Sequence, residues 1–313
     1  MKREIYTQLE EKLHQSLKKI KQTDPFLYNE MRTIYEMLKD AEYLSSKGLA
    51  QGPLKRVTEQ EAVALAAEFL ENCNSKYKEN MLEDYTNGKI IFNSKKKSFL
   101  VWNIYSLEYD INIEKTDTLT MAYDLVHEYF HSLNLNRYIL RQALTETISI
   151  TAEFLFLEFL KKKGYNEYDL NIINQIRRRF YNSNLHLLKI VLPLYLDKKE
   201  KNYVTEETYR NLPKLTGESQ QNIDLKLEYI LNSKNTDLET YTHTIGYLQA
   251  RMAICHGIDT QGLDMLNENL KNAEFKEFKE FEEKLLGNDS VETIHTYAKK
   301  DDFSYQPLQK VKK

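Results

Sequence analysis

The stretch AYDLVHEYFHSLN, residues 122–134, contains the spelling His-Glu-x-x-His at His127, Glu128 and His131. On a helix, residues four apart lie on one face, one turn above each other, so both imidazoles can reach a single metal ion. Glu128 lies one step further round the helix, where its carboxylate can act as a general base on a water without being a ligand. The stretch therefore predicts a metal site on a helix.

The competing interpretation is an accidental spelling in a chain rich in Glu and Tyr. With seven histidines in 313 residues, residue frequencies alone would produce this motif in roughly one or two sequences per hundred. Leu125, Val126 and Phe130 beside the motif favour a buried, poorly hydrated setting, in which electrostatic interactions are strong. A metal site is the better interpretation.

A second carboxylate-bearing segment supports it, because a catalytic zinc site usually takes three protein ligands and leaves the fourth position to water. The segment RQALTETISITAEFLFLEFLKKKG, residues 141–164, predicts a strongly apolar helix with Glu146 and Glu153 two turns apart on one side. A buried carboxylate is costly unless it is paired, protonated or bound to a metal. No Gly-x-x-His follows His131, so a glutamate rather than a nearby histidine is the expected third ligand.

Taken together, these segments resemble the thimet oligopeptidase and oligopeptidase F family of zinc peptidases. In that family a strand leads to a helix bearing His-Glu-x-Gly-His, and a second helix carries Glu-x-x-Ser-x-x-x-Glu. The matching segments here are SFLVWN (98–103), TLTMAYDLVHEYFHSL (118–133) and ETISITAE (146–153). The resemblance covers about half of the chain, from roughly residue 98 to residue 255.

The resemblance implies one Zn²⁺ ion of the gluzincin type, with a glutamate as third ligand. By this resemblance His127, His131 and Glu146 are the zinc ligands, and Glu128 is the catalytic base. Glu153 is a supporting carboxylate behind the ligands. The implied activity is that of a zinc metalloendopeptidase, which hydrolyses peptide bonds with a metal-activated water.

The family also has a late helix in which a Tyr next to a Gly steadies the oxyanion of the tetrahedral intermediate. The segment YTHTIGYLQA, residues 241–250, is similar to it. Tyr247, which follows Gly246, is the closest match, and His243 and Tyr241 are the other candidates. Tyr247 and His243 are therefore expected to be catalytic, and Tyr241 to contact the substrate.

The sequence departs from the family at two places that bear on function. Phe130 replaces the glycine of the motif, which predicts a narrower space beside the metal, and the N-terminal helical half is reduced to roughly 85 residues. The expected substrate is either short peptides or one specific protein target. The alternative is a catalytically retired, peptidase-like helical scaffold, which Phe130 favours and the retained Glu128 opposes.

Composition and local patterns predict a mainly α, zincin-like helical metallopeptidase. Gly and Pro are scarce (9 and 5), which favours long helices. Residues 89–114 alternate β-branched and aromatic residues with polar ones around a turn at residues 93–97, which predicts a small sheet beside the active-site helix. At the end of its strand, Trp102 and Asn103 are expected to bind the substrate.

Capping residues, glycines and prolines along the chain predict where helices begin and end. Thr58 to Glu61 reads as a capping box, Asp24 and Pro25 as an earlier helix start, and breaks are expected near Gly164, Pro213–Gly217, Asn232–Asn235 and Gly257. A stripe of Phe residues over 275–281 predicts a packed C-terminal helix. The expected organisation is a helical segment (1–85), a zinc peptidase core (86–265) and a C-terminal helix and tail (266–313), packed as one compact unit.

Charge and cysteine content narrow the partners. The formal net charge is -3, from 44 basic and 47 acidic residues that are well mixed, so no basic face for nucleic acid or an anionic membrane is expected. The two cysteines, Cys73 and Cys255, are in no metal-type spacing, which fits a reducing compartment. No apolar run reaches the roughly 18 residues of a membrane span. A cytoplasmic location is therefore expected, although export through a specialised system would leave no such mark.

Overall fold

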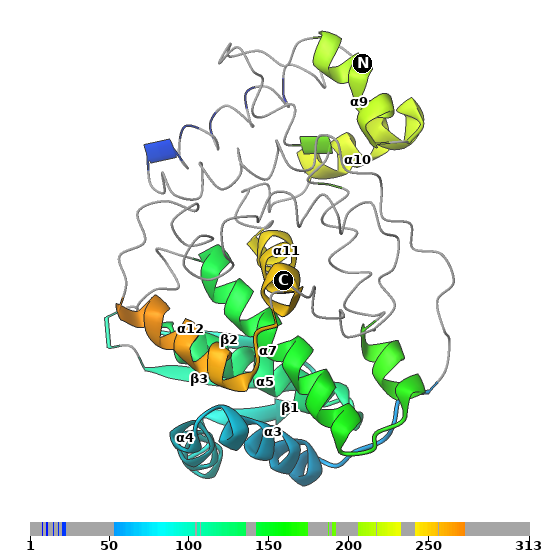
Figure 1. Cartoon of the computed structure of the whole chain (residues 1–313). Helices are drawn as coiled ribbons and strands as arrows, with labels where there is room; N and C mark the ends of the chain where they lie inside the picture. The colour runs from blue at the N-terminus through cyan, green and yellow to red at the C-terminus, as the bar shows by residue number, and fades with distance from the viewer. Residues whose placement is uncertain are drawn as a thin grey trace. The chain divides into compact units, whose positions relative to one another are not determined.

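The computed structural model describes residues 53–103, 105–106, 108–135, 142–174, 206–216, 218–232, 242–255 and 257–272, with isolated helical positions at 8, 11, 15, 18, 21, 22, 187, 190 and 191 (Figure 1). Its contacts group into two compact units, one of residues 1–46, 179–245 and 275–304, the other of residues 47–178, 246–274 and 305–313. The His-Glu-x-x-His motif belongs to the second unit. The division at residues 85 and 265 stays a prediction.

The first unit contains helices α9 (Glu206–Thr216) and α10 (Gln220–Asn232), which contact each other. The Tyr209 hydroxyl on α9 donates a hydrogen bond to the Asp224 carboxylate on α10. Of the break expected over Pro213–Gly217, Pro213 lies inside α9, which ends at Thr216. The break expected at Asn232 coincides with the end of α10.

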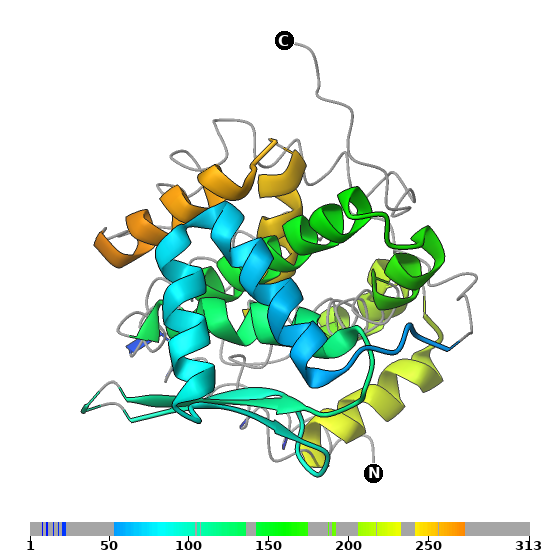
Figure 2. The ribbon, with the colours of Figure 1, turned by 90° about the horizontal axis from the view of Figure 1, so that it is seen from below.

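The second unit begins with a helical hairpin of α3 (Glu59–Cys73) and α4 (Ser75–Thr86), seen in Figure 2. The predicted capping box is confirmed: the Thr58 hydroxyl accepts from the Glu61 backbone N–H, and the Glu61 carboxylate accepts from the Thr58 N–H. Asn74 alone connects the two helices. Its N–H donates to the Leu70 carbonyl and its side-chain oxygen caps α4, so the chain reverses in a single residue.

A three-stranded sheet follows, formed by β1 (Ile90–Asn93), β2 (Phe99–Trp102) and β3 (Tyr109–Glu114). The strand order is β1-β3-β2, with β1 parallel and β2 antiparallel to the central β3. Ile111 on β3 pairs with Ile90 on β1 on one side and with Leu100 on β2 on the other. The three side chains therefore lie on the same, inner face of the sheet. The predicted sheet within residues 89–114 is confirmed.

Helix α5 (Thr120–Ser132) is the centre of this unit, and it contacts α3, β2, β3 and the long helix α7 (Gln142–Lys162). Helix α12 (Thr260–Asn272) packs on α7 and α3. Helix α11 (Thr242–Cys255) starts in the first unit and enters the second at Gly246. The expected breaks at Gly164 and Gly257 are present, and both glycines have positive φ values of 82° and 80°, which suits residues that end helices.

The predicted fold class, mainly α with a small sheet beside the motif helix, is confirmed. The expected helix start at Asp24 and Pro25 and the Phe stripe over 275–281 lie outside the described residues. In the part of the chain that the structure describes, no helix combines the length and apolar character needed to cross a membrane.

Candidate metal centre

Helix α5 presents His127 and His131 to the interior. Both residues are nearly fully buried, with 6% and 3% exposure, because α7, α3 and the sheet pack around α5. The two rings meet edge to face with centroids 4.6 Å apart, and their Nε2 atoms are 3.0 Å apart. The one-turn spacing seen in the sequence therefore brings both Nε2 atoms to one point.

Helix α7 supplies a carboxylate at the same point. Glu146 is completely buried, and its Oε2 lies 3.7 Å from His127 Nε2 while its Oε1 lies 3.3 Å from His131 Nε2. A tetrahedral ion with bonds of about 2.0 to 2.1 Å holds its ligand atoms roughly 3.3 Å apart. The two Nε2 atoms are 3.0 Å apart, each lies 3.3 to 3.7 Å from one of the two Glu146 oxygens, and one ligand atom from each residue lies within 4.8 Å of the others, so this donor set is close enough for one ion.

A buried His-His-Glu group could thus hold a metal ion, and among the described residues it is the one such group of three or more His, Cys, Asp or Glu side chains. The structure brings Glu146, and not Glu153, to the Nε2 side of the histidines. The roles of His127, His131 and Glu146 as ligands remain predictions that this arrangement fits.

Glu153 lies behind the histidines, two turns along α7. Its Oε1 is 2.8 Å from His127 Nδ1, and its Oε2 accepts a hydrogen bond of 2.7 Å from the Tyr123 hydroxyl. A carboxylate on Nδ1 fixes the ring orientation and leaves Nε2 for a metal. The sequence predicts Glu153 as a supporting carboxylate but misses Tyr123, whose only signal is its position four residues before His127.

The negative charge of these carboxylates dominates the electrostatics. Burial lowers the pKa of His127, but Glu153, followed by Glu128 and Glu146, outweighs it and raises that pKa to about 9. The metal-free site therefore attracts a proton, and a metal cation would compete with it for the same nitrogen.

Glu128 lies beside the pair and is half-buried. Burial raises the pKa of its carboxyl above the usual 4.5, while His127 and His131 oppose that rise. A raised pKa suits a general base, which works best when its pKa approaches the operating pH.

Phe130, which replaces the family's glycine, does not project into open space. On the helical wheel Glu128 and Phe130 flank the histidine pair on opposite sides. The Phe130 ring is fully buried and meets the ring of Tyr77 on α4 edge to face, with centroids 6.0 Å apart. The side chain thus contributes to the packing of α5 on α4.

Helix α11 touches α7 at the predicted third ligand. A Cβ atom placed on Gly246 would lie 2.5 Å from Glu146 Cβ and 2.9 Å from both the Glu146 carbonyl carbon and the Thr147 nitrogen. Glycine is therefore required for the two backbones to approach this closely. A hydrogen bond from the Thr147 hydroxyl to the Gln249 side-chain oxygen joins the helices one turn further on.

The three candidates for oxyanion stabilisation differ in where they lie. Tyr247 is buried in the second unit, and its ring lies 5.9 Å from that of Phe154 on α7. His243 is half-buried in the first turn of α11, which belongs to the first unit. Tyr241 lies outside the described residues. Their catalytic and substrate-binding roles stay predictions.

The segment of residues 98–103, which contains β2 and the predicted substrate-binding residues Trp102 and Asn103, is tied to α5 near the motif. The Ser98 hydroxyl donates to the Asp124 carboxylate at 2.7 Å and accepts from the Glu114 N–H at 2.9 Å. At its other end, the Asn103 side-chain oxygen accepts from the backbone N–H of Tyr105 at 2.8 Å. Asn103 thus shapes the turn toward β3, and Trp102 before it is half-buried.

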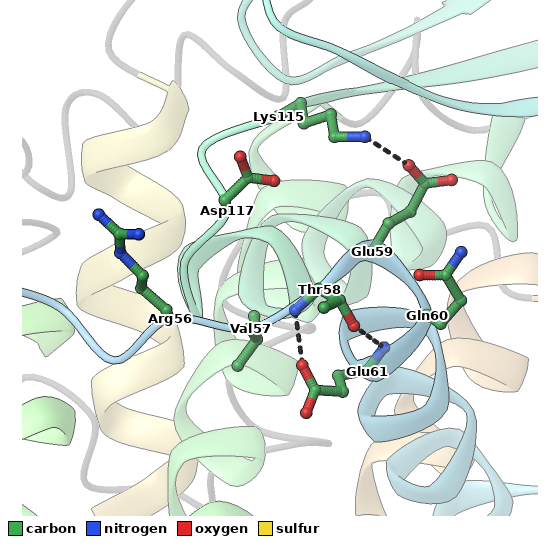
Figure 3. Close-up of a pocket in the computed structure, with 8 residues that line it drawn as sticks. All are labelled: Arg56, Val57, Thr58, Glu59, Gln60, Glu61, Lys115 and Asp117. Atoms are coloured by element: carbon green, nitrogen blue, oxygen red, sulfur yellow. Dashed lines mark hydrogen bonds and ion pairs between the residues drawn. The ribbon is translucent and has the colours of Figure 1, made fainter.

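A separate surface pocket lies at the start of α3 (Figure 3), lined by Arg56, Val57, Thr58, Glu59, Gln60, Glu61, Lys115 and Asp117. Four of its polar residues pair within the pocket. Thr58 and Glu61 form the capping box, and the Lys115 ammonium lies 3.2 Å from the Glu59 carboxylate. These contacts fix the chain where it enters α3, which is a structural role. The His-His-Glu group therefore remains the candidate functional site.

Comparisons with known proteins show a shared fold. No protein-family model matches the sequence, and no curated protein does. Among solved structures, the chain is similar to a "putative peptidase" from Chlamydophila abortus, with a TM-score of 0.56 and 16% sequence identity. The similarity covers 94% of this chain and 54% of the other, so this chain spans about half the length of that protein.

Proposed function

We propose that the protein is a zinc-dependent metallopeptidase of the thimet oligopeptidase and oligopeptidase F type. The observation that carries the proposal is the convergence of His127 Nε2, His131 Nε2 and the Glu146 carboxylate at one buried point, with Glu128 beside it. The fold shared with the Chlamydophila protein supports it. The convergence also weighs against a retired scaffold, which has no need to keep these four side chains together.

His127, His131 and Glu146 would hold the zinc ion, since imidazole and carboxylate donors suit zinc and three such ligands leave a fourth position for water. When bound, zinc would supply Lewis-acid polarisation of the scissile carbonyl and lower the pKa of a water toward about 7. Glu153 would keep His127 oriented through its contact with Nδ1.

Glu128 would move the proton. It takes a proton from the water as the water oxygen bonds to the carbonyl carbon, and it passes that proton to the amine nitrogen as the C–N bond breaks. Water and a peptide bond are thereby converted into a carboxyl and an amine. Tyr247 is the preferred donor to the oxyanion because it shares the compact unit of the ligands, with His243 as the other candidate.

The proposed substrate is a peptide, or a protein loop, in an extended conformation. Within the described strands β2 pairs with β3 alone, so its other edge is a place for a substrate strand to add through main-chain hydrogen bonds. The Ser98–Asp124 contact ties this strand to the helix that carries Glu128. Recognition of this kind depends on the substrate backbone more than on its side chains.

The test compares the purified wild-type chain with Glu128→Gln and His131→Ala, measuring zinc content and cleavage of a fluorogenic peptide library. Glu128→Gln should lose about 100- to 10,000-fold in turnover while it keeps zinc, because general acid–base help is worth that much. His131→Ala should lose zinc as well. Glu158→Gln, a half-buried glutamate later on α7, is the matched control and should remain active.

Appreciable turnover in Glu128→Gln would overturn the assignment of the base. A wild-type chain that binds zinc but cleaves neither the peptide library nor any protein in a whole lysate would indicate the retired scaffold. Cleavage of many short peptides would indicate a peptide scavenger, and cleavage of one lysate protein would indicate a dedicated protease.

A further inference from the structure

One carboxylate bridges two side chains of the same helix behind the metal centre. Tyr123 precedes His127 by four residues on α5, so both side chains reach α7 from one helix face. The Tyr123 hydroxyl donates to Glu153 Oε2 at 2.7 Å, and His127 Nδ1 lies 2.8 Å from Glu153 Oε1. Each carboxylate oxygen thus lies against one of these two side chains.

Two such contacts hold a carboxylate far better than one. The terminal torsion of a Glu side chain is broad and roughly two-fold, so a single hydrogen bond leaves the carboxylate plane free to turn. The Tyr123 hydroxyl gives Glu153 a second fixed point, and both donors are carried by one rigid helix. With the carboxylate plane fixed, Glu153 Oε1 stays beside His127 Nδ1, and His127 Nε2 is left facing Glu146 and His131.

Packing alone does not require the hydroxyl. The Tyr123 ring is 2% exposed and lies against the ring of Phe156, with centroids 6.5 Å apart, a contact that phenylalanine would also make. The same helix carries a second buried tyrosine, Tyr129, whose hydroxyl donates at 2.9 Å to the backbone carbonyl of Tyr77. The two tyrosines match in helix and burial, and differ in the acceptor.

We propose that Tyr123 is a positioning residue for the metal, whose hydroxyl holds Glu153 in the orientation that aims His127 Nε2 at the ion. The proposal rests on the proposed function because it concerns the same metal centre. It extends that centre by one residue on the side away from the ion. Tyr123 acts through Glu153 and His127 and does not touch the substrate.

The experiment measures zinc affinity of the full-length chain by competition with a chromophoric chelator, in wild type, Tyr123→Phe and Tyr129→Phe. Tyr123→Phe should weaken zinc binding about 10- to 100-fold, the usual effect of removing a group that supports a ligand, and Tyr129→Phe should change it by less than about twofold. Both variants should lose similar thermal stability without metal, because each loses one buried hydrogen bond. Equal zinc affinities in the two variants would overturn the proposal.

Glu153→Gln provides a second readout that does not depend on overall stability. In a Gln side chain an NH₂ donor replaces one of the two carboxylate oxygens, so it cannot offer an acceptor at both of the positions that face Tyr123 and His127. Adding Tyr123→Phe to Glu153→Gln should therefore weaken zinc binding by less than about threefold further, since residues in one hydrogen-bond network are not additive. A full 10-fold or larger additional loss would show that Tyr123 acts independently of Glu153.

Peptide turnover at saturating zinc separates positioning from catalysis, because a residue that acts through metal binding should regain most of its turnover once the site is filled. A wild-type chain that binds no zinc, or a His131→Ala variant that binds it like wild type, would sink the proposed function and this inference with it. Zinc binding that His131→Ala abolishes but Tyr123→Phe leaves intact would sink the inference alone.

Discussion

Helix α5 is lined by two groups of buried polar side chains that differ in charge. One is the candidate metal cluster, made of His127, His131 and Glu146, which could hold a metal ion, with Glu153 and Tyr123 beside them. The other is the anchoring network, which joins the C-terminal end of α5 to α4 and α12 and is made of Tyr77, Asn74, Asn134, Asp264 and Asn267.

In the anchoring network, side-chain amides and a phenol meet matching acceptors. Asn134 donates to Asn267, Asn267 donates to the Tyr77 oxygen at 2.8 Å, and that hydroxyl donates to Asp264. One carboxylate is shared among neutral donors. The candidate metal cluster instead sets two fully buried carboxylates against two imidazoles, with a third carboxylate at Glu128. Burial of polar groups is common to both regions, and only the excess of negative charge points to a cation.

The largest expected effect is that of the metal on stability. Zinc at about 1,000 times its dissociation constant should raise the free energy of unfolding by about 4 kcal/mol, because it binds only the folded chain. A strong chelator should remove this gain, as followed by thermal unfolding. His131→Ala should lose the gain. A variant of the anchoring network that lost it as well would contradict the separation of the two regions.

The next effect concerns the contact between α11 and α7. Gly246→Ala should cost about 1 to 3 kcal/mol of stability, since the added methyl overlaps the Glu146 backbone and forces the helices apart. It should also weaken zinc binding, because Glu146 must move. Gly262→Ala on α12 is the control: its Cβ would meet nothing closer than 3.5 Å. Calorimetric titration measures the zinc affinity of both variants and so distinguishes displacement of Glu146 from a loss of stability alone. An unchanged zinc affinity in Gly246→Ala would rule out the displacement.

The smallest effect is expected in the anchoring network. Asn267→Ala removes the partner of Asn134 and Tyr77 and should lower the free energy of unfolding by about 1 to 2 kcal/mol. Its zinc affinity should match that of wild type, measured by the same chelator competition. A large drop in affinity would show that the two groups are coupled through α5.

Local features were predictable because they depend on neighbours in sequence. The capping box at Thr58 needs residues three apart, and the pairing of His127 with His131 needs one helical turn. The strands within residues 89–114 follow from side-chain alternation. The strand order β1-β3-β2 could not be predicted from alternation. It depends on the path of the chain after Trp102, which places β3 between β1 and β2.

The site beyond the motif was only partly predictable from the residues. Glu146 and Glu153 lie on one side of α7, and choosing which one faces Nε2 requires the axial register of α7 against α5. Tyr123 has no signal until that register places Glu153 beside it. The contact of Gly246 with Glu146 joins residues 100 positions apart, and no local pattern encodes it.

Among the described strands β2 pairs with β3 alone, and this position in the sheet bears on how the protein avoids aggregation. An open strand edge is a template for any other chain, and proteins commonly blunt such edges by keeping them short and charged. Strand β2 has four residues, and the exposed Lys95, Lys96 and Lys97 lie in the connection before it, separated from it by Ser98. A short edge of this kind does not offer the long pairing surface that seeds aggregation, but it can still pair with one short peptide strand. Peptide binding and protection against fibril growth can therefore depend on the same four residues.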